Sequence, residues 1–180
     1  MNILVIAQYF PPDMGGGATR AYNAVKGLIL NDCKVTVITA FPHYPHGKIP
    51  DKYRWKPFLV EYIEGMKIIR TFILPLESKG LARRLALFIT FLLSSLFPLF
   101  LVNKIDAIFA ANPNIISFIP SYIYSKIKKA YIILNVDDLW PEELYNTGLL
   151  ERNSLFAKIA EKLAQIAYRR ADLITPISPG

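Results

Sequence analysis

The sequence predicts an α/β fold in which an open parallel sheet carries helices on both faces. Apolar, strand-like runs alternate with segments of helical periodicity along the whole chain. The first three segments, Ile3–Ala7, Ala18–Leu30 and Val35–Thr39, form a β-α-β unit, and such units build parallel sheets. The chain has 180 residues and is 53% hydrophobic, which is enough for one domain with a sizeable core.

Local patterns predict the elements in order. Ile3–Ala7 is a continuous apolar run, typical of a buried parallel strand, and Ala18–Leu30 repeats apolar residues at helical spacing. Glu64-Gly65 between two apolar runs is a hairpin signal. The next predicted elements are the apolar helix Leu85–Val102, the strand Ala107–Ala110 and a helix to Lys128 that Asn112-Pro113-Asn114 caps. The strand Tyr131–Val136, a helix to Arg170 that Ser154 caps, and a last strand, Leu173–Thr175, follow.

The apolar helix Leu85–Val102 has 18 residues without a charge, near the lower limit for a membrane span. The pattern favours a buried or surface-docked helix of a soluble fold. A helix that lies in a membrane interface is the alternative. A true span is disfavoured, because a strand of the same sheet follows directly.

The net charge of +7 fits nucleic acid, an anionic membrane surface or phosphorylated small molecules as partners. Nucleic acid is disfavoured, because the basic residues are scattered and no nucleic-acid motif accompanies them. Cys33 is the only cysteine, which predicts no disulfide framework and no thiolate metal site and suits a reducing cytoplasm. Met1-Asn2 leads straight into a strand, so no signal peptide is expected.

Polar residues concentrate in four loops that follow predicted strands. These loops are Gln8–Gly17, Ala40–Pro57, Ala111–Asn114 and Asp137–Glu142. In open parallel sheets, ligands bind beyond the carboxyl ends of the strands. We therefore expect the functional site where these loops meet.

The first loop ends in three glycines, Gly15 to Gly17, at a helix start. Glycines let backbone N–H groups approach a ligand closely, and a helix N-terminus favours negative charge. The loop therefore suits a phosphate or a sugar hydroxyl; the other interpretation is a tight turn with close helix–sheet packing. Arg20 is either a phosphate partner or an ordinary exposed arginine. The spacing is not G-x-G-x-x-G, which argues against a dinucleotide fingerprint.

Asp137-Asp138 at a strand end is the best candidate for a general base. Adjacent carboxylates disfavour joint ionisation, which raises one pKa. Neighbouring side chains point apart there, so we expect only one to face the cleft. Helix capping before Pro141 is the structural alternative. Trp140 either stacks against a sugar ring or is a buried residue of the core.

The two histidines, His43 and His46, lie three residues apart in the Ala40–Pro57 loop. A metal site needs a further ligand, and no cysteine or nearby carboxylate pattern supplies one. Solvated loop histidines are favoured, and contact with substrate is the next interpretation.

Read together, these segments resemble the N-terminal domain of GT-B glycosyltransferases of family 4 ("group 1"), and most of all the subgroup that makes bacterial surface polysaccharides, including transferases of N-acetylated fucosamine-type sugars. The resemblance covers essentially the whole chain. It is carried by Gln8-Tyr-Phe-Pro-Pro-Asp-Met-Gly-Gly-Gly-Ala-Thr-Arg20, Val35-Thr-Val-Ile-Thr-Ala-Phe-Pro-His-Tyr-Pro45, Ala110-Ala-Asn-Pro113, Asp138-Leu-Trp-Pro-Glu142 and Ile174-Thr-Pro-Ile-Ser-Pro-Gly180.

The resemblance implies a Rossmann-like domain over residues 1–180 that forms one half of a GT-B fold and binds the acceptor. It implies a retaining sugar transfer without metal or cofactor, with Asp138 as the catalytic acidic residue, where many relatives carry a histidine in that loop. The expected substrate-binding residues are Gly15, Gly16, Gly17, Arg20, His43, Asn112, Asp137 and Trp140.

The resemblance also implies partners. A donor-binding domain absent from this chain would hold the nucleotide-sugar, so we expect the chain alone to be inactive. The acceptor would be a glycan or a polyprenyl-diphosphate-linked sugar at the cytoplasmic membrane face, with Lys79, Arg83 and Arg84 docked on anionic lipid. The alternatives are a non-catalytic, membrane-docking or partner-binding subunit of a two-chain transferase, and a GT-B relative such as a nucleotide-sugar epimerase.

Overall fold

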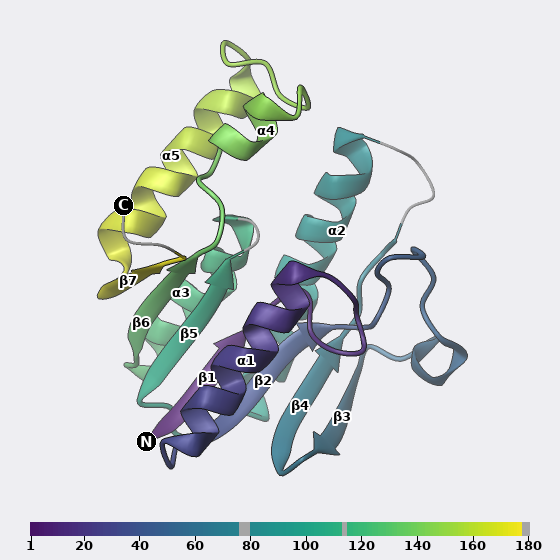
Figure 1. Ribbon diagram of the computed structural model, residues 1–180, viewed down its shortest axis with the longest axis vertical. Coiled ribbons are helices and arrows are strands. Elements are labelled where there is room, and N and C mark those ends of the chain that lie inside the picture. Colours follow the sequence, from purple (N-terminus) through teal and green to yellow (C-terminus); the bar gives the residue numbers. More distant parts are fainter. Residues whose placement is uncertain (76–79, 113–114, 178–180) are drawn as a thin grey trace.

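A seven-stranded sheet forms the middle layer of the protein, in the order β3-β4-β2-β1-β5-β6-β7 (Figure 1). The structure is a computed structural model that describes residues 1–75, 80–112 and 115–177. Its strands are β1 (Asn2–Ile6), β2 (Lys34–Ala40), β3 (Phe58–Ile63), β4 (Met66–Thr71), β5 (Ala107–Asn112), β6 (Tyr131–Val136) and β7 (Leu173–Pro176). Its helices are α1 (Gly16–Leu30), α2 (Leu81–Ser94), α3 (Phe118–Lys128), α4 (Glu142–Asn146) and α5 (Leu155–Arg170), with 3₁₀ turns η1 (Asp51–Tyr53), η2 (Phe97–Phe100) and η3 (Ile115–Ser117).

Strand direction differs at one edge of the sheet, where the predicted hairpin lies. All neighbouring strands from β4 to β7 are parallel, whereas β3 pairs antiparallel with β4. The predicted hairpin turn explains the difference, because a two-residue connection can only join antiparallel strands. Glu64 and Gly65 both have the positive φ that such a turn requires, 50° and 78°. The fold is therefore a Rossmann-like, mostly parallel sheet with an antiparallel edge.

Helices cover both faces of the sheet, as predicted. Helix α1 packs on one face, where Ala21 and Val25 meet Val5 and Val37 in a buried cluster. Helices α2, α3 and α5 pack on the other, larger face, and α5 presents a row of small side chains to it: Ala157, Ala160, Ala164 and Ala167. Both cores are apolar, so burial of these faces stabilises the fold.

The two crossovers from the middle of the sheet run over opposite faces. From β1 the chain crosses through α1 to β2, and from β4 it crosses through α2 to β5 on the other side of β1. Strands β1 and β5 are neighbours in register, with Val5 opposite Phe109. The loops at their carboxyl ends diverge, and this switch point is where open α/β sheets bind ligands.

The predicted helix Leu85–Val102 has different bounds. Helix α2 begins at Leu81 and ends at Ser94, and the 3₁₀ turn η2, with Pro98, follows. Thr90 and Ser94 donate side-chain hydrogen bonds to carbonyls one turn back, which competes with helical bonding near this end. By length and apolar composition alone, Ala82–Phe100 would be able to cross a membrane, with 33% of that window buried in the protein. The earlier start places Arg83 and Arg84 in the first turn of α2.

Candidate functional site

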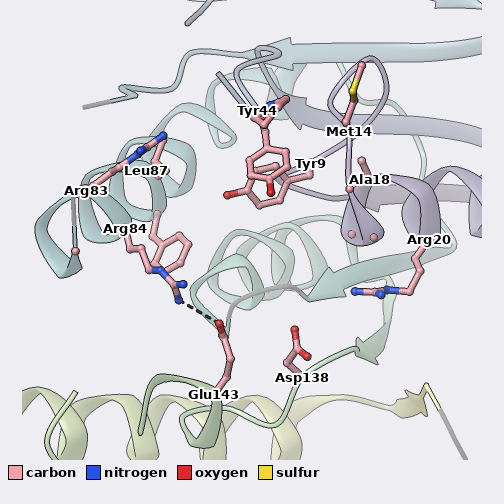
Figure 2. A pocket seen from close by; sticks show the side chains of 16 residues that line it. Tyr9, Met14, Ala18, Arg20, Tyr44, Arg83, Arg84, Leu87, Asp138 and Glu143 are labelled. Atoms are coloured by element: carbon pink, nitrogen blue, oxygen red, sulfur yellow. Dashed lines mark hydrogen bonds and ion pairs between the residues drawn. The ribbon is translucent and has the colours of Figure 1, made fainter. Parts of the chain in front are cut away.

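A cavity of about 540 Å³ opens at the carboxyl edge of the sheet, beside the switch point (Figure 2). Its walls come from the glycine loop and α1, from the loop after β2, from the first turns of α2 and from the loop after β6. The predicted binding residues Gly15–Gly17 and Arg20 line it, and so does the predicted catalytic residue Asp138. Five residues that the sequence analysis does not assign to the site line it as well: Tyr9, Tyr44, Arg83, Arg84 and Glu143.

The glycine loop presents its backbone to the cavity, because Gly15 to Gly17 have no side chains. Gly15 has a φ of +120°, and a Cβ there would lie 3.2 Å from Cε1 of Tyr44. A Cβ on Gly16 would lie 3.0 Å from Nη1 of Arg20. Helix α1 begins at Gly16 with no side-chain cap and no acidic residue in its first turn. Its first N–H groups therefore have no partner within the helix and favour an anionic ligand.

Two buried polar groups hold this loop in place. The Asp13 carboxylate accepts hydrogen bonds from the backbone N–H groups of His43, at 2.7 Å, and Tyr44, at 2.8 Å. The fully buried guanidinium of Arg70 donates to the carbonyl of Pro11 at 2.5 Å and pairs with Glu61. The loops after β1 and β2 are thus tied to each other and to β4, so the cavity wall is preformed.

A series of polar contacts from the ends of β6 and β7 holds the Arg20 side chain in place. Its Nε lies 2.9 Å from Oδ2 of Asp137, whose side chain is buried. The other oxygen of Asp137 accepts a hydrogen bond from Asn135 at 2.8 Å, and Thr175 donates to Asn135 in turn. Asp137 therefore orients an arginine and lies outside the lining of the cavity.

Asp138 is exposed and points into the cavity between Arg20 and Glu143 (Figure 2). Within the described part of the chain, its carboxylate makes no ion pair or hydrogen bond. The expectation that only one of the two adjacent aspartates faces the cleft is confirmed. A free carboxylate in a cavity is able to accept a proton from a bound hydroxyl.

Two arginines of α2 form the wall opposite α1 (Figure 2). Arg84 pairs with Glu143 of α4, Nη1 to Oε1 at 3.1 Å, and this pair ties α2 to the segment that carries Asp138. Arg83 makes no ion pair among the described residues, and Nη2 would lie 3.0 Å from a Cβ on Gly47. Lys79, the third cation expected in this region, lies outside the described residues.

Aromatic rings form the third wall. Tyr9 stacks on His43, with ring centroids 5.3 Å apart, and meets Tyr44 edge to face at 5.9 Å. Burial, with a smaller contribution from the Asp13 carboxylate, raises the pKa of Tyr9 to about 12. Its hydroxyl therefore stays protonated at neutral pH and is a hydrogen-bond donor in the cavity.

His43 is buried behind this wall and is not a solvated loop residue. Its Nδ1 lies 2.9 Å from the carbonyl of Phe41 and 3.8 Å from Oδ2 of Asp13. Burial lowers the pKa of His43, against the opposing effect of Asp13, and burial raises the pKa of Asp13. The favoured interpretation, a solvated histidine, holds only for His46, which is exposed. Among the described residues, no three His, Cys, Asp or Glu side chains gather as a metal site.

Trp140 and Asn112 complete the predicted set. Trp140 is buried and meets Phe88 edge to face, 5.9 Å between centroids, so it is a core residue that lies outside the cavity lining. The backbone of Asn112 ends β5 at the carboxyl edge. Its side chain, and the predicted cap with Pro113 and Asn114, lie outside the described residues.

Comparison with known proteins adds no identification. No protein-family model matches the chain, and no curated protein matches its sequence.

Proposed function

We propose that the chain is the acceptor-binding half of a retaining glycosyltransferase with a GT-B fold, acting in surface polysaccharide biosynthesis. One observation carries the proposal: the free carboxylate of Asp138 faces an uncapped helix end and arginines across one cavity at the switch point of the sheet. This arrangement suits a reaction that places a hydroxyl beside a phosphate-bearing leaving group.

The residues have separate roles in this proposal. The α1 N-terminus and Arg20 bind the phosphates of a nucleotide-sugar that a second domain presents. Asp138 accepts the proton of the acceptor hydroxyl while the hydroxyl oxygen bonds to the anomeric carbon on the same face from which the diphosphate leaves, so the configuration is retained. The leaving diphosphate keeps the electron pair of the broken sugar–phosphate bond. Asp137 acts through Arg20 as a positioning residue. No metal or cofactor has a role in this scheme.

Membrane contact is the second part of the proposal. The outer side of α2 and η2 exposes Ile89, Leu93, Phe97 and Phe100, and no Asp or Glu stands between Glu77 and Asp106. Apolar side chains without nearby acidic residues suit an anionic lipid surface. A lipid-linked acceptor would be met there, at the cytoplasmic face. These exposed residues form an apolar stripe of α2 and η2, which would equally serve the alternative, a membrane-docking subunit of a two-chain transferase.

A transfer assay separates these possibilities. The full natural gene product is incubated with a panel of nucleotide-sugars and a polyprenyl-diphosphate-linked sugar, and the product is identified by mass. Asp138→Asn is expected to lower kcat by about 10²- to 10⁴-fold. The matched control is Asp51→Asn, a substitution of an exposed aspartate outside the cavity.

Three results would count against the proposal. Wild-type kcat in Asp138→Asn would remove this residue from the chemistry. Absence of transfer with every donor, together with retained vesicle binding, would favour the non-catalytic subunit. Transfer by the 180-residue chain alone would overturn the expectation that it lacks the donor half.

A further inference from the structure

An apolar groove of about 80 Å³ adjoins the charged cavity, between α2 and α5. Its lining includes Leu85, Ile116, Trp140, Phe156, Ile159 and Leu163.

The groove and the cavity share a wall. Phe88 lines the cavity, and it packs edge to face against Trp140, which lines the groove. Along α2, Arg83 and Arg84 line the cavity and the next residue, Leu85, lines the groove. The change from a guanidinium surface to an apolar one therefore occurs within one helical turn.

Two groove residues are exposed although they are large and apolar. Phe156 and Ile159 lie on α5, the former 57% and the latter 49% exposed. Exposed apolar side chains that gather beside a polar site mark a surface for an apolar ligand or partner. The groove has room for a few methylene or isoprene groups. Its volume is too small for a helix, whose diameter with side chains is about 10 Å.

We propose that the groove holds the first part of the hydrocarbon chain of a lipid diphosphate, whose phosphates lie in the cavity beside Arg83. Arg83 makes no ion pair among the described residues, so its guanidinium is available to a phosphate. Arg84, paired with Glu143, positions the α2 end of the cavity. This inference rests on the proposed function, in which the acceptor is lipid-linked, and assigns that lipid to specific residues.

Calorimetric titration of the 180-residue chain tests the assignment with three probes: inorganic pyrophosphate, farnesyl diphosphate below its micelle concentration, and UDP. We expect farnesyl diphosphate to bind more tightly than pyrophosphate, because the chain buries apolar surface. Ile159→Asn is expected to weaken farnesyl diphosphate binding by about fivefold and to leave pyrophosphate and UDP unchanged. Ile166→Asn on the same helix, 42% exposed and outside the groove, is the matched control.

The head-group end has its own variant. Arg83→Gln is expected to weaken pyrophosphate and farnesyl diphosphate by about tenfold each. Arg169→Gln, the same charge change at the end of α5 and outside the cavity, is the control. Circular dichroism and urea unfolding verify that every variant is folded, which the exposure of Ile159 favours.

The binding results can be interpreted independently of the transfer assay. Equal effects of Ile159→Asn and Ile166→Asn, or equal affinities for pyrophosphate and farnesyl diphosphate, would overturn the groove assignment even if the enzyme transfers sugar. Unchanged binding of both diphosphates by Arg83→Gln would overturn the head-group assignment. Groove-dependent binding without any sugar transfer would leave this inference standing and count against the proposed function.

Discussion

Arg20 of α1 and Asp137 of the loop after β6 form an ion pair that bridges the two halves of the sheet on either side of the switch point. Nε and Oδ2 are 2.9 Å apart, and the aspartate is buried whereas the arginine is 42% exposed. The buried partner therefore depends on the exposed one for compensation of its charge.

Arg20→Gln should destabilise the chain. The variant leaves the Asp137 carboxylate buried with Asn135 as its remaining side-chain partner, which costs about 1 to 3 kcal/mol in free energy of unfolding. Urea unfolding measures the change. In the double variant Arg20→Gln/Asp137→Asn most of the loss should be recovered, because no charge stays buried. Additive losses from the two substitutions would show that the pair does not couple.

Gly15→Ala should destabilise the glycine loop. Its φ of +120° is strained for alanine, and the new Cβ would press on the Tyr44 ring at 3.2 Å. The expected loss is about 1 to 3 kcal/mol, measured by thermal unfolding. Gly27→Ala is the control, since it lies within α1 with open space around the new Cβ. That variant should gain about 0.5 to 1 kcal/mol, and a loss there as large as at Gly15 would contradict the argument.

Stability should fall as the pH drops below about 6.5, the usual pKa of histidine. The folded state has a lowered pKa at His43, so the unfolded state binds more protons in this window, and stability decreases by at most about 1.4 kcal/mol per pH unit. Asp13 acts in the opposite sense, because burial raises its pKa in the folded state.

Replacement of His43 by Gln isolates this contribution. The variant removes the titrating imidazole, so its stability between pH 7.5 and 5.5 should be flat or should rise as the pH falls. Urea unfolding at several pH values gives both slopes. An unchanged slope in His43→Gln would assign the pH dependence to other groups.

Binding to vesicles should depend on both charge and the exposed stripe of α2 and η2. We expect binding to phosphatidylglycerol vesicles that salt weakens, and little binding to phosphatidylcholine vesicles. Phe100→Ser, at a residue 91% exposed, should reduce binding severalfold, because that ring no longer inserts. Leu30→Ser, at a residue 82% exposed on α1, is the control. Equal binding to both vesicle types, or to neither, would contradict this expectation.

Local patterns were sufficient for most elements of the fold. Ile3–Ala7 is a continuous apolar run, and Tyr131–Val136 is apolar except for Asn135. The Glu64-Gly65 turn is predictable because a glycine between two apolar runs suits the positive φ of a hairpin turn. The predicted start of α2, Leu85, lies four residues after the observed start, Leu81. Gly80 and the following Arg83 and Arg84 interrupt the apolar pattern, and periodicity does not show that a polar first turn lies against a cavity.

The site was predictable only in part. The position of the glycines and Asp138 at one cavity is predictable, because strand ends meet at one edge of a parallel sheet. Arg84 and Glu143 come together from segments 59 residues apart in the sequence, through an ion pair between α2 and α4, and no local sequence signal predicts that contact. The prediction of a solvated His43 is wrong, because the burial of this side chain depends on the Tyr9 ring and on Asp13, both in another loop.

The bare N-terminus of α1 also has a thermodynamic consequence. Since no side chain caps the helix, an anion bound to its first N–H groups takes the place of the missing cap and is released when the protein unfolds. Folding and occupancy are then linked, so the melting temperature rises with ligand concentration. Measurement of the melting temperature in the presence of phosphorylated sugars and lipids therefore detects ligands without a label and without knowledge of the reaction.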